Sequence, residues 1–95
     1  MKLAWSNLAK RELEELRQSS IERWGRDVAL HYLEDLRTAA KQLATDPLRA
    51  NPLKGPFRIF RVRSHYIIVH VDAAADRLAI ARVLHVAMDI ERHLP

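Results

Sequence analysis

The chain has 95 residues, 48% of them hydrophobic, and carries a formal net charge of +4 at neutral pH. This length and apolar content predict that residues 1–95 form one folded domain rather than a disordered chain. Cysteine is absent, which excludes disulfides and thiolate metal sites, and the early charged residues argue against a signal peptide; we expect a cytoplasmic protein without a membrane span.

The first half of the sequence predicts a short strand followed by two helices. Residues 2–5 can form the strand, and Ser6 is a suitable N-cap for the helix that follows. Apolar residues then recur at spacings of three and four up to Trp24, and Gly25 can end this helix. A second helix with the same spacing begins near Asp27 and ends before the next proline. The two apolar stripes predict a helical hairpin that packs on a sheet.

The second half of the sequence changes from helical to strand periodicity. Residues 47–56 hold three of the four prolines and are expected to form a loop. Residues 57–62, 65–71 and 78–85 are rich in β-branched and aromatic side chains, which predicts three antiparallel strands. A short helix from about 87 to 94 is expected to follow. The predicted fold class is therefore α+β, with a helical hairpin on a mostly antiparallel sheet.

Basic residues cluster in the second half of the chain. Residues 1–48 carry eight Lys or Arg against eight acids, whereas residues 49–63 carry five basic residues and no acid. Such a surface attracts nucleic acid, an acidic protein or an acidic peptide. Strand alternation places Arg61 and Arg63 on the same face; the plainer interpretation is that they are solvated charges on an exposed face. The predicted basic surface consists of Lys54, Arg58, Arg61, Arg63, Arg82 and His85.

Two of these residues have specific alternatives. Arg82 lies in an apolar strand, where a buried charge requires a partner. It either lines the basic surface, pairs with Asp89 or Glu91 in the last helix, or reaches the edge of the sheet. His85 ends the same strand, where it is either a general acid or base or a hydrogen-bonded structural residue.

The sequence carries no familiar catalytic or metal-binding pattern. His65 and His70 are an odd number of residues apart on one strand and so face opposite ways. There is no HExxH, no GxSxG and no glycine-rich phosphate loop. We therefore expect no catalytic residues, no metal and no cofactor.

The order of elements, together with several short strings, resembles the RelE/ParE toxin superfamily over nearly the whole chain, and its ParE branch most closely. The strings are Trp24-Gly25, Leu53-Lys54-Gly55, Arg61-Val62 before Tyr66-Ile67-Ile68, and Ile80 to His85 followed by Met88-Asp89. The resemblance implies the toxin of a type II toxin–antitoxin system. It also implies a cognate ParD-like antitoxin whose acidic C-terminal segment folds on the toxin, giving a hetero-oligomer.

The resemblance also implies a target. ParE toxins are understood to trap DNA gyrase on cleaved DNA, which blocks replication and requires a binding surface rather than catalysis. The alternative is a ribosome-dependent mRNA endoribonuclease of the RelE type, in which basic residues at positions like Lys54, Arg63 and His85 act with a late Tyr or His. This chain has no tyrosine after Tyr66, and its last residues offer His93 alone. That departure favours the gyrase inhibitor.

Overall fold

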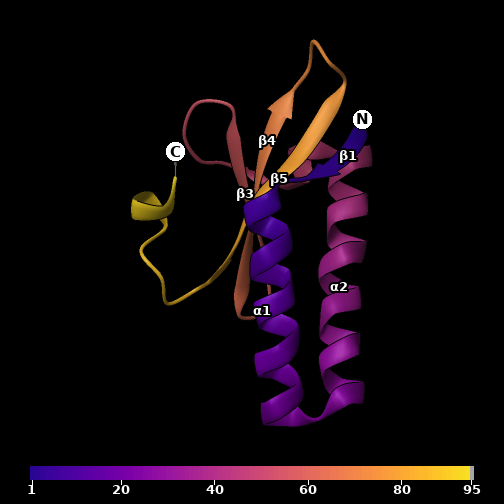
Figure 1. Ribbon diagram of the computed structural model, residues 1–95. Coiled ribbons are helices and arrows are strands. Elements are labelled where there is room, and N and C mark those ends of the chain that lie inside the picture. Colours follow the sequence, from indigo (N-terminus) through magenta and orange to yellow (C-terminus); the bar gives the residue numbers. More distant parts are fainter. Residues whose placement is uncertain (95) are drawn as a thin grey trace.

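The structure, a computed structural model, describes residues 1–94 and consists of two helices on a five-stranded sheet. The elements in chain order are β1 (Lys2–Trp5), α1 (Asn7–Trp24), α2 (Arg26–Thr45), the 3₁₀ helix η1 (Pro47–Arg49), β2 (Asn51–Pro52), β3 (Phe57–Val62), β4 (His65–Asp72), β5 (Arg77–His85) and the 3₁₀ helix η2 (Ile90–His93). The helices α1 and α2 lie side by side as a hairpin (Figure 1). The predicted α+β class is confirmed.

The sheet has the strand order β1-β5-β4-β3-β2. β1 runs parallel to β5, and all other pairs are antiparallel. The four predicted strands are confirmed, whereas β2 is an addition within the predicted loop. It pairs with β3 through Asn51 and Pro52 alone, and proline, which has no N–H to donate, is tolerated because β2 is an edge strand.

The helical hairpin follows from two local signals in the sequence. The Ser6 hydroxyl accepts a hydrogen bond from the amide of Ala9 at 3.0 Å, which caps α1 as predicted. Gly25 alone separates α1 from α2, with φ of 87° and ψ of 166°. That conformation is essentially confined to glycine. The chain therefore reverses direction within one residue.

The core lies between the hairpin and the sheet, and α2 supplies more of it than α1. Eight residues of α2 are buried, but in α1 only Ala9 and Ser20 are. The apolar spacing of α1 runs up to Trp24, but this side chain is 54% exposed. The ribbon of the hairpin extends past the sheet at the end where α1 meets α2 (Figure 1). Within residues 1–94, neither helix is long and apolar enough to cross a membrane.

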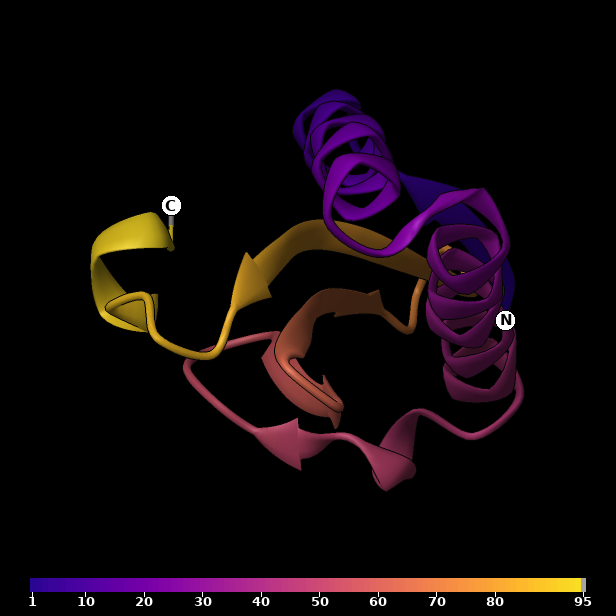
Figure 2. The same ribbon diagram turned by 90° about the horizontal axis from the view of Figure 1, so that it is seen from below.

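The predicted short C-terminal helix is present but is shorter than residues 87 to 94. The chain turns after β5, and only Ile90–His93 forms a single 3₁₀ turn, set apart from the helical hairpin (Figure 2). His85 accounts for the difference, because its ring accepts a hydrogen bond from the amide of Ala87 and its carbonyl accepts one from Met88. These bonds stabilise a turn where the helix would begin.

Candidate protein-interaction site

Three of the predicted basic residues lie along β3 and the loop before it. Arg61 is exposed, and its Nε donates to the carbonyl of Arg63 at 2.7 Å, while its outer nitrogens bond to nothing in residues 1–94. Lys54 is exposed in the loop. Arg58 is half-buried and donates from Nε to the carbonyl of Ala50 at 3.0 Å. Lys54 and Arg61 are therefore open to a partner, whereas Arg58 helps to hold the loop.

Arg63 lies outside β3, so strand alternation does not set the direction of its side chain. β3 ends at Val62, and Arg63 lies in the two-residue turn to β4 with φ of 52°. This left-handed conformation breaks the alternation. The side chain reaches α2 instead, where it forms an ion pair with Asp35 and its guanidinium carbon lies 5.4 Å from the centre of the Tyr32 ring.

Arg82 is paired with an acid, but the acid is neither Asp89 nor Glu91. Its guanidinium donates to the carboxylate of Glu12 in α1, with the shortest contact at 2.7 Å, and to the carbonyl of His93 at 2.8 Å. The two side chains of the ion pair are only 16% and 14% exposed. Arg82 therefore lies within the packing between α1 and β5 and does not stand free on a basic surface.

The open edge of β5 explains why this pair forms. β1 covers β5 only as far as Ile80, and the start of α1 covers the rest. The Ser6 hydroxyl donates to the carbonyl of Ala81 at 2.8 Å, and the Glu12 carboxylate accepts from the amide of Val83 at 3.0 Å. Glu12 thus replaces a neighbouring strand at a point where an amide would otherwise lack a partner.

Tyr32 joins α2 to the turn between β3 and β4. Its hydroxyl oxygen lies 2.7 Å from Nδ1 of His65, 3.2 Å from the amide of Ser64 and 3.2 Å from the carbonyl of Val62. The hydroxyl donates to the carbonyl of Val62 and accepts from the amide of Ser64, and the direction of its bond to His65 depends on which ring nitrogen carries the proton. Burial, with a smaller effect of His85, lowers the pKa of His65, and burial raises the pKa of Tyr32. At neutral pH, His65 is therefore neutral.

His85 extends this arrangement at the end of β5. Its ring centre lies 5.2 Å from that of His65, and the two rings are nearly perpendicular at 87°. Nδ1 of His85 accepts from the amide of Ala87 at 3.0 Å, so the neutral ring carries its proton on Nε2. In both imidazoles Nε2 takes no part in these contacts, and in His85 it carries the proton of the neutral ring.

The two histidines border a cavity of about 270 Å³ between the hairpin and the sheet. We call it the hairpin–sheet pocket; its principal residues are Ser20, Arg23 and Trp24 of α1 and Tyr32, His65 and His85 opposite them. Ser20 is 1% exposed, and its hydroxyl has no hydrogen-bond partner in the described part of the chain. Most buried hydroxyl groups are hydrogen-bonded, so this one is an exception that calls for a partner.

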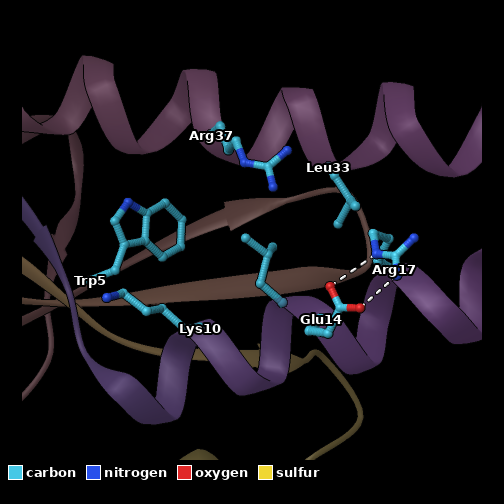
Figure 3. A pocket seen from close by; sticks show the side chains of 7 residues that line it. Trp5, Lys10, Glu14, Arg17, Leu33 and Arg37 are labelled. Atoms are coloured by element: carbon cyan, nitrogen blue, oxygen red, sulfur yellow. Dashed lines mark hydrogen bonds and ion pairs between the residues drawn. The ribbon is translucent and has the colours of Figure 1, made fainter.

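A second cavity, of about 280 Å³, lies between α1 and α2 (Figure 3). We call it the interhelical pocket; it is lined by the apolar side chains of Trp5, Leu13 and Leu33 and the charged ones of Lys10, Glu14, Arg17 and Arg37. Arg17 is neutralised by Glu14, with the ion pair at 2.6 Å. Lys10 and Arg37 form no ion pair with any residue from 1 to 94, so this cavity also has a positive rim.

The sequence signals for this site were incomplete. The apolar spacing of α2 predicts burial of Tyr32, but it does not identify the residues that its hydroxyl bonds. A buried tyrosine usually finds a hydrogen-bond partner for its hydroxyl, and this rule is the signal that could have pointed to the site. Glu12 and Ser20 carried no comparable signal.

Among residues 1–94, no group of three or more His, Asp or Glu side chains could hold a metal ion.

Comparison with known proteins agrees with this architecture. Residues 3–90 match the family described as the ParE toxin of the type II toxin–antitoxin system, parDE. Toxin ParE1 of Mycobacterium tuberculosis is 30% identical over 92 residues, which cover 94% of this chain and 93% of that protein.

Solved structures share the fold at lower identity. A chain of the chromosomal ParDE system from P. aeruginosa superposes with a TM-score of 0.80 at 20% identity, over 90% of this chain and 96% of that one. A chain of the toxin–antitoxin complex RelBE2 from Mycobacterium tuberculosis gives 0.68 at 19% identity, over 88% and 95%. The family match and the ParE1 relative, each spanning nearly the whole chain, show that this chain belongs to the ParE toxin family of type II toxin–antitoxin systems.

Proposed function

We propose that this ParE-family toxin inhibits DNA gyrase by trapping it on cleaved DNA, and that it catalyses no reaction itself. The observation that carries the proposal is the state of Arg82. A surface that cleaves RNA needs cationic groups aimed at the phosphate that gains charge. Arg82 is instead neutralised by Glu12 and bonded to the carbonyl of His93, and Arg63 is paired with Asp35.

The second candidate is a ribosome-dependent mRNA endoribonuclease. The fold likeness to a chain of the RelBE2 complex favours it, as does the neighbouring pair His65 and His85. A general base for the ribose 2'-hydroxyl must reach the substrate, and His85 is exposed. This candidate assigns a proton-transfer role to His85, whereas the gyrase proposal assigns none.

One pair of assays separates the two candidates. The purified chain is incubated with gyrase and supercoiled plasmid, and in parallel with ribosomes carrying a defined mRNA. We expect gyrase-dependent linear plasmid and intact message, and in cells filamentation with an SOS response. Rapid cleavage of the ribosome-bound message, without gyrase-dependent DNA breaks, would contradict the gyrase proposal and support the nuclease.

The proposed partner is a ParD-like antitoxin with an acidic C-terminal segment that folds on the toxin to form a hetero-oligomer. Two features of the chain support it. Five basic residues and no acid lie between residues 49 and 63, and Trp24 leaves a large apolar surface exposed beside the hairpin–sheet pocket. Charge and apolar area of this kind suit a segment that folds as it binds.

Because gyrase acts on the chromosome, the proposal also places the chain in the cytoplasm.

The partner is tested by expression with and without the neighbouring antitoxin gene. We expect arrested growth when the toxin is expressed alone and normal growth when both are expressed. Unimpaired growth with the toxin alone would count against both the antitoxin and the toxic activity.

A further inference from the structure

We infer that the hairpin–sheet pocket binds a carboxylate, supplied by an acidic side chain of the antitoxin segment. The inference rests on the proposed antitoxin partner and names the chemistry by which one of its side chains is held. The cavity volume of about 270 Å³ is near the lower limit of small-ligand pockets. It therefore suits a side chain, or a side chain and its neighbour, rather than a large ligand.

Ser20 supplies the first reason. Its side chain lines the pocket, is 1% exposed and has a hydroxyl without a partner in residues 1–94. An unpaired buried hydroxyl costs free energy that a bound acceptor recovers. Rotation about a single bond directs this hydroxyl, so it can donate to an oxygen that enters the pocket.

The imidazoles of His65 and His85 supply the second reason. The hydroxyl of Tyr32 is hydrogen-bonded to Nδ1 of His65, and the amide of Ala87 donates to Nδ1 of His85. The neutral ring of His85 therefore presents Nε2–H, a donor, and both rings line the pocket. Their orientation is held by these bonds before any ligand arrives, which lowers the entropic cost of binding.

Arg23 and Trp24 supply the charge and the apolar wall. Arg23 lies in the last turn of α1, lines the pocket and has no ion pair among the described residues. None of the described residues that line the pocket is acidic. A carboxylate in the pocket would therefore lie near hydrogen-bond donors and the positive charge of Arg23. Apolar side chains of the antitoxin segment would pack against the ring of Trp24.

The interhelical pocket is the natural rival and suits a carboxylate less well. Figure 3 shows the carboxylate of Glu14 among its lining side chains, paired to Arg17. That negative charge opposes a second carboxylate. The cavity serves as an internal control.

The test uses phenylacetate as a probe of the purified full chain, with phenylacetamide as its neutral counterpart. Amide resonances are followed by NMR during titration. We expect phenylacetate to bind about tenfold more tightly than the amide, because hydrogen bonds to a charged acceptor are the stronger ones. The largest shifts should fall on Ser20, His65 and the indole of Trp24.

Three variants make the test specific. Ser20→Ala and Arg23→Gln should each weaken phenylacetate binding about tenfold. Ser20→Ala should melt no lower than the original chain, because it removes a buried hydroxyl that makes no bond to residues 1–94. Arg26→Gln removes a neighbouring charge outside the pocket and should bind as the original chain does. Equal affinity for the two probes, full affinity of Ser20→Ala, or shifts confined to the interhelical pocket would overturn the inference. A chain that fails these tests yet arrests growth and is neutralised by its antitoxin would leave the proposed function standing.

Discussion

The ion pair between Glu12 and Arg82 connects residues 70 positions apart and is nearly covered by protein. Removing one partner leaves a charge without compensation in a region of low polarity. We expect Arg82→Ala to reduce the free energy of unfolding by about 3 kcal/mol, at the lower end of the range for buried pairs because some solvent reaches both side chains. Urea denaturation measures the loss.

The exposed pair of Arg17 and Glu14 is the control for this prediction. Its side chains are 38% and 54% exposed, so Arg17→Ala should lower the free energy of unfolding far less than Arg82→Ala does. If the two arginine variants lose equal stability, the packing between α1 and β5 does not bury the Glu12 pair in solution. Reduced toxicity of Arg82→Ala can be attributed to function only after its stability is known.

His65 makes folding sensitive to acid. Burial lowers the pKa of His65 below its ordinary value of 6.5, so the unfolded chain binds a proton more readily than the folded one. The contribution of this residue is complete above pH 6.5 and is lost as the pH falls from there through the lower folded pKa. Urea midpoints from pH 7.5 to 5 should decline, and His65→Gln should reduce that slope. His31→Gln, at an exposed position, should keep it; an unchanged slope in His65→Gln would refute the assignment.

Among the elements, the hairpin depends on the single residue that joins its helices. At Gly25 an added Cβ would meet no atom within 4 Å, so any cost of Gly25→Ala comes from the backbone conformation and not from a clash. Residues forced into this conformation cost about 1 to 3 kcal/mol. We expect a corresponding fall in unfolding free energy for Gly25→Ala. Gly55→Ala, at φ of 55° where other residues are sometimes found, should cost less; the reverse order would contradict this explanation.

The sequence predicted the elements wherever the deciding interaction was local. Ser6, Gly25 and the prolines after α2 act within a few residues, and the helices and strands they bound were predicted within a residue or two. β2 and the C-terminal turn were not, because each depends on contacts formed in the folded state. Asn51 and Pro52 form β2 only by pairing with β3. The ring of His85 accepts a hydrogen bond from the amide of Ala87, which would have no partner in the first turn of a helix.

The side-chain arrangement of the site was less predictable for the same reason. Alternation along a strand fails at Arg63 because one left-handed residue turns its side chain toward α2. The partner of Arg82 lies on the first helix, and no spacing rule links positions 12 and 82. The hairpin–sheet pocket likewise combines α1, α2 and two strand ends, so it exists only after the chain has folded.

For the whole molecule, the uneven charge predicts how a partner approaches. Basic residues along β3 and the loop before it should speed the association of an acidic segment, and added salt should slow it. We expect Lys54→Gln/Arg61→Gln to reduce the association rate constant for the antitoxin several-fold at low salt, with a smaller effect on dissociation. Stopped-flow fluorescence measures both rates. The control variant Arg11→Gln/Lys41→Gln has the same net charge as Lys54→Gln/Arg61→Gln. An equal fall in its association rate constant would mean that the total charge, and not its location, governs the encounter.

The parallel pairing of β1 with β5 has a consequence for synthesis. Lys2–Trp5 are synthesised long before their partners Arg77–Ile80, which lie 75 positions later in the chain. The hairpin of α1 and α2 uses local contacts and can form early, whereas this edge of the sheet must wait for β5. The hairpin–sheet pocket, which includes His85 at the end of β5, is therefore among the last features to form, and a partner that uses it can engage only a chain whose sheet is complete.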